Sequence, residues 1–151
     1  MREPLLVSAC LMGMKCRYDG GDKLRPGVTE LAERYDLVPV CPELLGGLPV
    51  PRRPSEIKGG RVLSQDGTDL TAEFRLGAER ALELALSRGA RKALLKSNSP
   101  SCGSGRVYDG TFSGRLVPGD GMAAALLKSR GIEVFTEQRL DLLRGGGTEE
   151  P

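Results

Sequence analysis

Short apolar runs alternate with helical patterns along the chain, and this order of elements constrains the fold more than any other feature. The apolar runs that we predict to be buried strands span residues 5–9, 37–40, 92–96 and 132–135. The clearest helical pattern begins at Asp69, continues for about twenty residues and ends at Gly89. Alternating strands and helices are typical of a parallel sheet. We therefore expect an α/β fold with a small, mostly parallel sheet and helices on both faces, in Rossmann-like or flavodoxin-like layering.

The remaining elements are shorter. Helices are predicted for residues 26–35, 122–130 and 136–143, and a short strand for residues 61–64. With 21 Gly and 10 Pro in the chain, residues 42–60 and 103–121 are too rich in both for regular structure. We expect ordered loops there, and long loops in compact domains are often functional. The last residues, 144–151, are expected to be disordered, which leaves a single domain over residues 1–143.

Charge and hydropathy exclude several classes of protein. The formal net charge of +2 and the pI near 8.4 are too mild for the basic face that nucleic-acid binding requires. The chain has no apolar run of membrane-spanning length, and its first apolar run is too short for a signal peptide. We therefore expect a cytoplasmic protein, whose cysteines are more often metal ligands or catalytic groups than disulfides.

Three of the four cysteines follow predicted strands. Cys10, Cys41 and Cys102 each come after a different apolar run. Because the carboxyl ends of parallel strands share one edge of the sheet, and ligands bind outside that edge, these thiols are expected to meet at one small ligand.

Several roles are open to such thiols. Inert core cysteines would sit in the middle of strands, not at junctions flanked by Gly, Pro and Ser. Zinc is not favoured, since the chain has no C-x2-C pair and no His. Iron–sulfur clusters need only thiolates, and three ligands would leave one iron open to substrate. A non-enzymatic protein that binds zinc or senses oxidation remains the alternative.

Three motifs make the pattern specific. They are SACLMGMKCRYDG at residues 8–20, CPELLGGLPVPR at residues 41–52 and LKSNSPSCG at residues 95–103. Together, over residues 5–135, they closely resemble the thiouracil desulfidase family, in the order in which they occur there. The resemblance implies a [4Fe–4S] cluster on Cys10, Cys41 and Cys102, and removal of sulfur from thiolated pyrimidines such as 2-thiouracil without net redox chemistry. Cys16 matches a further family position and could be a spare thiol, a sulfur-handling group or an alternative ligand.

The residues around these cysteines suggest how such chemistry would proceed. A soft thione sulfur would favour an open iron, and water could then attack the ring carbon. Glu43 is the candidate general base, although a loop carboxylate can also cap a backbone amide. Ser99 and Ser101 could donate hydrogen bonds to the ring or the water, or simply shape the turn. Asn98 and Asp19 are substrate-binding candidates with the same alternative role as turn residues. The sequence leaves open whether the substrate is a free base, a nucleoside or tRNA.

Overall fold

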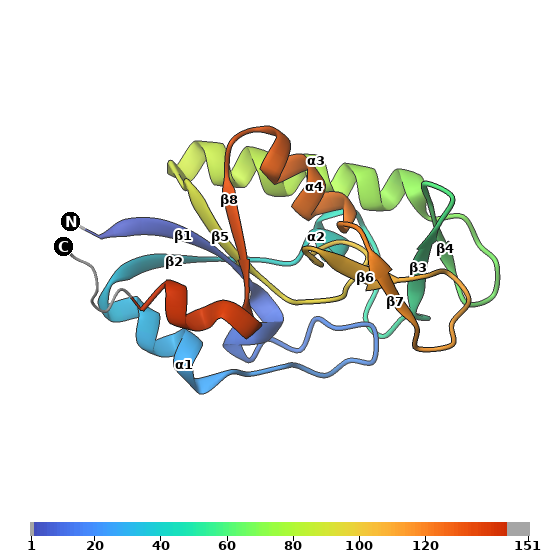
Figure 1. Ribbon diagram of the computed structural model, residues 1–151, viewed down its shortest axis with the longest axis horizontal. Coiled ribbons are helices and arrows are strands. Elements are labelled where there is room, and N and C mark those ends of the chain that lie inside the picture. Colours follow the sequence, from blue (N-terminus) through green and yellow to red (C-terminus); the bar gives the residue numbers. More distant parts are fainter. Residues whose placement is uncertain (1, 145–151) are drawn as a thin grey trace.

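A four-stranded parallel sheet lies at the centre of the computed structural model, which describes residues 2–144 (Figure 1). In spatial order its strands are β2 (Tyr35–Val40), β1 (Glu3–Ser8), β5 (Lys92–Leu95) and β8 (Glu133–Thr136). Every neighbouring pair is parallel. The predicted α/β fold with a parallel sheet is therefore confirmed.

Helices cover both faces of this sheet (Figure 1). One face packs against α3 (Thr71–Arg88) and α4 (Met122–Ser129), with Leu6, Ala85 and Leu127 in a shared core. The other face packs against α1 (Pro26–Thr29) and the 3-10 helices η2 (Glu30–Glu33) and η3 (Glu137–Leu142), around Leu5 and Val7. Successive β1 residues alternate between the two cores because side chains along a strand point to opposite faces.

Smaller elements gather where β1 and β2 end (Figure 1). They are the 3-10 helix η1 (Ala9–Met12), the helix α2 (Pro42–Leu45), the antiparallel hairpin of β3 (Ser55–Lys58) and β4 (Arg61–Ser64), and a second antiparallel hairpin of β6 (Arg106–Tyr108) and β7 (Leu116–Pro118). The expectation that residues 42–60 and 103–121 lack regular structure was therefore wrong. Their glycines occupy turns between short strands: Gly59 and Gly60, both with positive φ, connect β3 to β4.

The predicted ends of other elements also shift. The helix expected over residues 26–35 changes to 3-10 geometry after Thr29, and β2 begins at Tyr35. The terminal helix is the 3-10 helix η3, interrupted at Arg139 by a non-helical backbone. No helix within the described residues is long and apolar enough to cross a membrane. The tail predicted to be disordered lies, from residue 145 on, outside the described residues.

Candidate functional site

A cavity of about 390 Å³ opens at the carboxyl ends of β1, β2 and β5, and all four cysteines line it. Cys10 lies in η1 just after β1, Cys41 directly follows β2, and Cys102 lies in the loop after β5. Cys16 joins them from the loop after η1. All four thiols are free. The topology thus brings together the three cysteines selected from the sequence, and a fourth with them.

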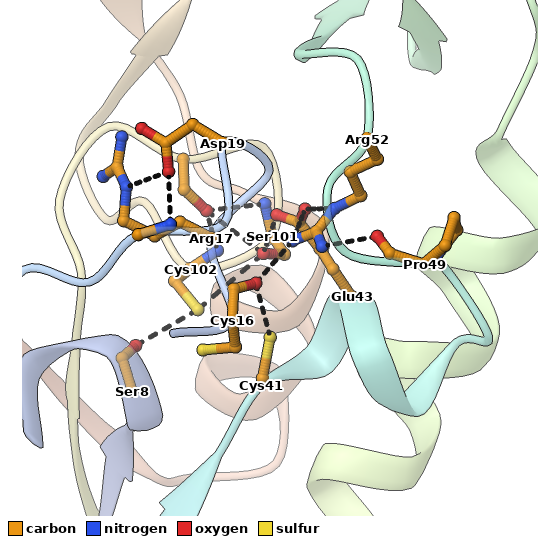
Figure 2. Close-up of polar contacts among 12 residues, drawn as sticks. Ser8, Cys16, Arg17, Asp19, Cys41, Glu43, Pro49, Arg52, Ser101 and Cys102 are labelled. Atoms are coloured by element: carbon orange, nitrogen blue, oxygen red, sulfur yellow. Dashed lines mark hydrogen bonds and ion pairs between the residues drawn. The ribbon is translucent and has the colours of Figure 1, made fainter. Parts of the chain in front are cut away.

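Cys102 is held at the junction of β1 and β5. Its sulfur accepts a hydrogen bond from the Ser8 hydroxyl at 3.2 Å (Figure 2). Ser8 in turn accepts a hydrogen bond from the backbone N–H of Lys96 at 2.9 Å. Burial raises the pKa of the Cys102 thiol to about 12, against the lowering effect of hydrogen bonds from Ser8 and from Ser101, whose hydroxyl lies 3.7 Å from the sulfur. Ser8 is itself buried and links the end of β1 to the loop that carries this cysteine.

The other three thiols line the same cavity. Interaction with Cys10 raises the pKa of Cys16, and burial adds to this. Interaction with Cys16, followed by burial, raises the pKa of Cys41. The Cys41 thiol also lies 3.8 Å from the backbone carbonyl of Cys16, toward which it donates (Figure 2). The raised pKa values of Cys16 and Cys41 favour their thiol forms, and a metal ligand must be a thiolate, so metal binding by either group would release a proton.

A chain of polar side chains runs beside the thiols (Figure 2). One carboxylate oxygen of Glu43 accepts from Arg52 Nε at 2.9 Å and lies 2.7 Å from Arg52 Nη2, while the other accepts from the Ser101 hydroxyl at 3.0 Å. Ser101 lies 3.1 Å from the Ser99 hydroxyl, which also accepts the N–H of Cys102 at 2.7 Å. Since Ser101 has one proton and gives it to Glu43, Ser99 donates to Ser101. Three predicted catalytic residues therefore form one connected network.

Arg52, the last residue of the motif at residues 41–52, connects this network to the cysteine loops. Its Nη2 donates to the carbonyl of Cys16 at 3.0 Å and its Nη1 to that of Pro49 at 2.9 Å (Figure 2). The guanidinium side chain is only 8% exposed. Five fixed donors allow one arginine to bind a carboxylate and two carbonyls at once.

Close backbone packing sets the position of the two loops that carry these groups. A Cβ on Gly77 of α3 would lie 1.9 Å from the carbonyl oxygen of Pro42, at the start of α2. A Cβ on Gly121, which precedes α4, would lie 2.6 Å from the carbonyl of Ser101. Glycine at both positions therefore lets α3 and α4 support the loops directly.

The two substrate-binding candidates are placed differently. Asn98 lines the cavity with a φ of 71°, a left-handed conformation that asparagine tolerates better than most residues. Asp19 is not among the lining residues of the cavity. Its half-exposed carboxylate accepts the N–H of Gly21 at 2.9 Å in a turn, and this hydrogen bond lowers its pKa.

The cysteines of the cavity have the ligand chemistry of an iron–sulfur cluster. Among residues 2–144, no three His, Cys, Asp or Glu side chains converge tightly enough to hold one metal ion. A [4Fe–4S] cluster presents its irons at separate corners, so its ligand sulfurs lie farther apart than ligands that share one ion. A cavity lined by four free thiols and no imidazole matches the thiolate ligands of such clusters.

Comparisons of the sequence and of the fold with known proteins point to one family. The sequence is 42% identical, over 147 residues, to the uncharacterized protein YbbK of Bacillus subtilis (strain 168), covering 91% of this chain and 97% of the relative. The fold matches the solved structure of a [4Fe-4S]-dependent thiouracil desulfidase, TudS (DUF523Vcz), with a TM-score of 0.89 and 48% identity, covering 95% of this chain and 96% of the other. The sequence model of the 2-thiouracil desulfurase family matches residues 5–139. The chain therefore belongs to the 2-thiouracil desulfurase family.

Proposed function

We propose that this protein is an iron–sulfur-dependent desulfidase that removes sulfur from thiolated pyrimidines such as 2-thiouracil by a non-redox, hydrolytic route. The observation that carries the proposal is the cavity in which the four thiols lie beside the Glu43–Ser101–Ser99 network. The similarity to a [4Fe-4S]-dependent thiouracil desulfidase supports the same chemistry.

Cys10, Cys41 and Cys102 are the proposed ligands of a [4Fe–4S] cluster. They come from the ends of three adjacent strands, β1, β2 and β5, which the parallel pairing holds in fixed register. When bound on three thiolates, the cluster supplies an open, Lewis-acidic iron for a soft thione sulfur. Cys16 lines the same cavity, and its backbone carbonyl lies 3.8 Å from the Cys41 thiol, so we assign it the role of an additional thiol beside the ligands.

The polar network is the proposed acid–base machinery. Ser101 directs its proton to Glu43, so its oxygen accepts rather than donates toward Ser99. A water beside this pair can give a proton to the carboxylate directly or through the Ser101 hydroxyl as it attacks the ring carbon. Arg52 fixes the Glu43 carboxylate from the opposite side, which holds the second oxygen toward Ser101.

The cavity also bears on the substrate. Its volume of about 390 Å³ suits a small-molecule ligand, within the usual range for such pockets. With a net charge of +2, the chain is not built for a polynucleotide, and we place a free base or nucleoside ahead of tRNA. Four free thiols in one site are consistent with a reducing compartment such as the cytoplasm.

Cluster reconstitution followed by a sulfide-release assay tests the proposal. The reconstituted protein should be brown, contain close to four irons per chain and release sulfide from 2-thiouracil but not from uracil. Colourless protein that retains zinc would reject the proposal in favour of the alternative metal-binding role.

Cysteine variants provide the matched comparison. Cys102→Ser should lose both the cluster and sulfide release, because thiolate supplies most of the affinity for iron. Cys16→Ser should retain most of the iron. Equal loss of iron from both variants would mean that four thiolates hold the cluster, leaving no open iron for a thione.

A further inference from the structure

The tip of the β6–β7 hairpin lines the cavity but has no part in the acid–base network. Phe112 and Gly114 line the cavity from this tip, which connects the two strands over residues 109–115, and Tyr108 lines it from the adjoining end of β6. Tyr108 and Phe112 are both half-buried. The β6–β7 hairpin thus gives the cavity two aromatic side chains, one of them from the tip, in a chain whose aromatic content is only 4%.

A buried carboxylate on the neighbouring hairpin holds the tip in place. Glu56 of β3 is 8% exposed, and its Oε1 accepts the backbone N–H of Gly110 at 2.9 Å and that of Phe112 at 3.1 Å. Within the described residues Glu56 has no partner in an ion pair. Burying a carboxylate is costly unless it is hydrogen-bonded, so the energetic compensation for this one comes from the backbone of the tip.

The tip is packed tightly and carries backbone strain at Phe112. A Cβ on Gly110 would lie 2.7 Å from the Lys58 side chain and 2.9 Å from the carbonyl oxygen of Ile57. Phe112 itself has a φ of 58°, which is uncommon for any residue but glycine and unfavourable for a bulky one. Such strain persists where the surrounding structure imposes it, and it concentrates at ligand-binding positions.

These observations have one explanation in common. We infer that the β6–β7 tip binds the face of the substrate ring, with Phe112 as the aromatic contact and Glu56 as the positioning residue that holds Phe112 in its strained conformation. The inference rests on the proposed function for the identity of the ring, a thiolated pyrimidine. Stacking on an aromatic side chain depends on the flat π-face of the ring and little on the ring's substituents. This contact therefore sets the affinity for the ring, while the sulfur is recognised by the thiol-lined side of the cavity.

Phe112→Ala tests the contact directly in the reconstituted protein. KM for 2-thiouracil should rise roughly five- to hundredfold, the range expected for loss of base–aromatic stacking, while kcat and iron content stay within about twofold. Phe112→Tyr keeps a ring and should restore a KM close to that of the unmodified protein. An unchanged KM in Phe112→Ala would overturn the inference.

Glu56 variants test the positioning role. Glu56→Gln retains a carbonyl acceptor for the two N–H groups and should behave almost as the unmodified protein, whereas Glu56→Ala should raise KM with little effect on kcat. Because Glu56 acts through Phe112, the Glu56→Ala/Phe112→Ala double variant should be no worse than Phe112→Ala alone. Additive increases in KM, or a loss confined to kcat, would refute the positioning role.

Equilibrium binding of uracil separates this inference from the proposed function. Uracil has the same ring without the sulfur, so calorimetry with it does not depend on desulfuration. Uracil binding that weakens in Phe112→Ala, in a protein that releases no sulfide, would reject the proposed function and retain the ring-binding tip. Sulfide release with no effect of Phe112→Ala on either KM or uracil affinity would do the reverse.

Discussion

The close contact between α2 and α3 predicts that Gly77→Ala lowers the stability of the protein, whereas the same substitution normally stabilises a helix. Gly77 lies in the middle of α3, where alanine is normally favoured over glycine by about 1 kcal/mol. Here, however, an added Cβ would lie 1.9 Å from the Pro42 carbonyl oxygen and 3.2 Å from the Gly46 nitrogen. Both neighbours are backbone atoms, so no side-chain rotation can relieve the clash.

The geometry gives the size of the effect. To reach ordinary contact at 3.4 Å from 1.9 Å, α2 must move away by about 1.5 Å. Overpacking of this kind costs about 3 kcal/mol at the upper end of its range, and the gain in helix propensity returns about 1 kcal/mol. The net loss of about 2 kcal/mol corresponds to a fall in Tm of roughly 4 to 8 °C for a chain of this size.

The same displacement should reduce activity, because α2 carries Glu43. The hydrogen bond of 3.0 Å between Ser101 and Glu43 cannot survive a shift of that size without rearrangement. Misplacement of a reacting group by about 1 Å can cost on the order of a hundredfold in rate. We therefore expect Gly77→Ala to lower kcat for sulfide release by about tenfold or more.

Thermal unfolding and steady-state sulfide release measure both effects, and an exposed position on α3 provides the control. At Glu79 the alanine variant should be more stable than the glycine variant by about 1 kcal/mol, with no change in activity. A Gly77→Ala protein as stable and active as its parent would show that α2 is free to adjust, and that its packing on α3 does not fix the site.

Three further predictions concern charged side chains. Glu43→Gln should keep the iron content and the KM while slowing sulfide release by about 10²- to 10⁴-fold, as expected on loss of a general base. Full activity of this variant in stopped-time assays would assign the role of general base to another group. Arg52→Ala leaves the Glu43 carboxylate buried without its cation and should lower the free energy of unfolding by about 3 to 5 kcal/mol, measured with urea; a change below about 1 kcal/mol would contradict a structural ion pair. Burial opposes ionisation of Glu137, but hydrogen bonds from Ser97 and the charge of Lys96 outweigh it, and the pKa of Glu137 is lowered. Its charge therefore stabilises the fold at pH values above 4.5, the pKa of the unfolded chain, and this effect is lost as the pH falls through the lower pKa of the folded state. Glu137→Gln should therefore unfold more easily at pH 7, and its stability should fall less on acidification.

The parallel sheet could be predicted because its strands are continuous apolar runs. Leu5, Leu6 and Val7 are completely buried, as a central parallel strand requires, and their pattern needs no tertiary information. In the two hairpins only β4 was predicted, as a short strand over residues 61–64, and the other three strands were not. β3 and β6 are four and three residues long and mix charged with apolar side chains. Such short segments do not show the alternation of polar and apolar residues by which a strand is recognised in a sequence.

The cysteine cavity was predictable for a related reason, since sheet topology places strand ends together. The residues that position its side chains were not. Ser8, Arg52 and Glu56 act through partners far away in the sequence, at separations of 94, 36 and 54 residues for Cys102, Cys16 and Gly110. Nothing in the local sequence distinguishes a buried arginine or glutamate from an exposed one, so only the folded chain reveals them.

The order of strands in the sheet has a consequence for how the protein matures. Cys10 and Cys41 follow β1 and β2, which pair with each other, whereas Cys102 follows β5, which pairs with β1 only after α3 has crossed over the sheet. A chain emerging from the ribosome therefore presents two or three thiols on an incomplete sheet before it can present the last one. The proposed cluster could be inserted on all three ligands only once about two thirds of the chain has been made and β5 has docked. Folding of the central sheet would then have to precede insertion of the cluster.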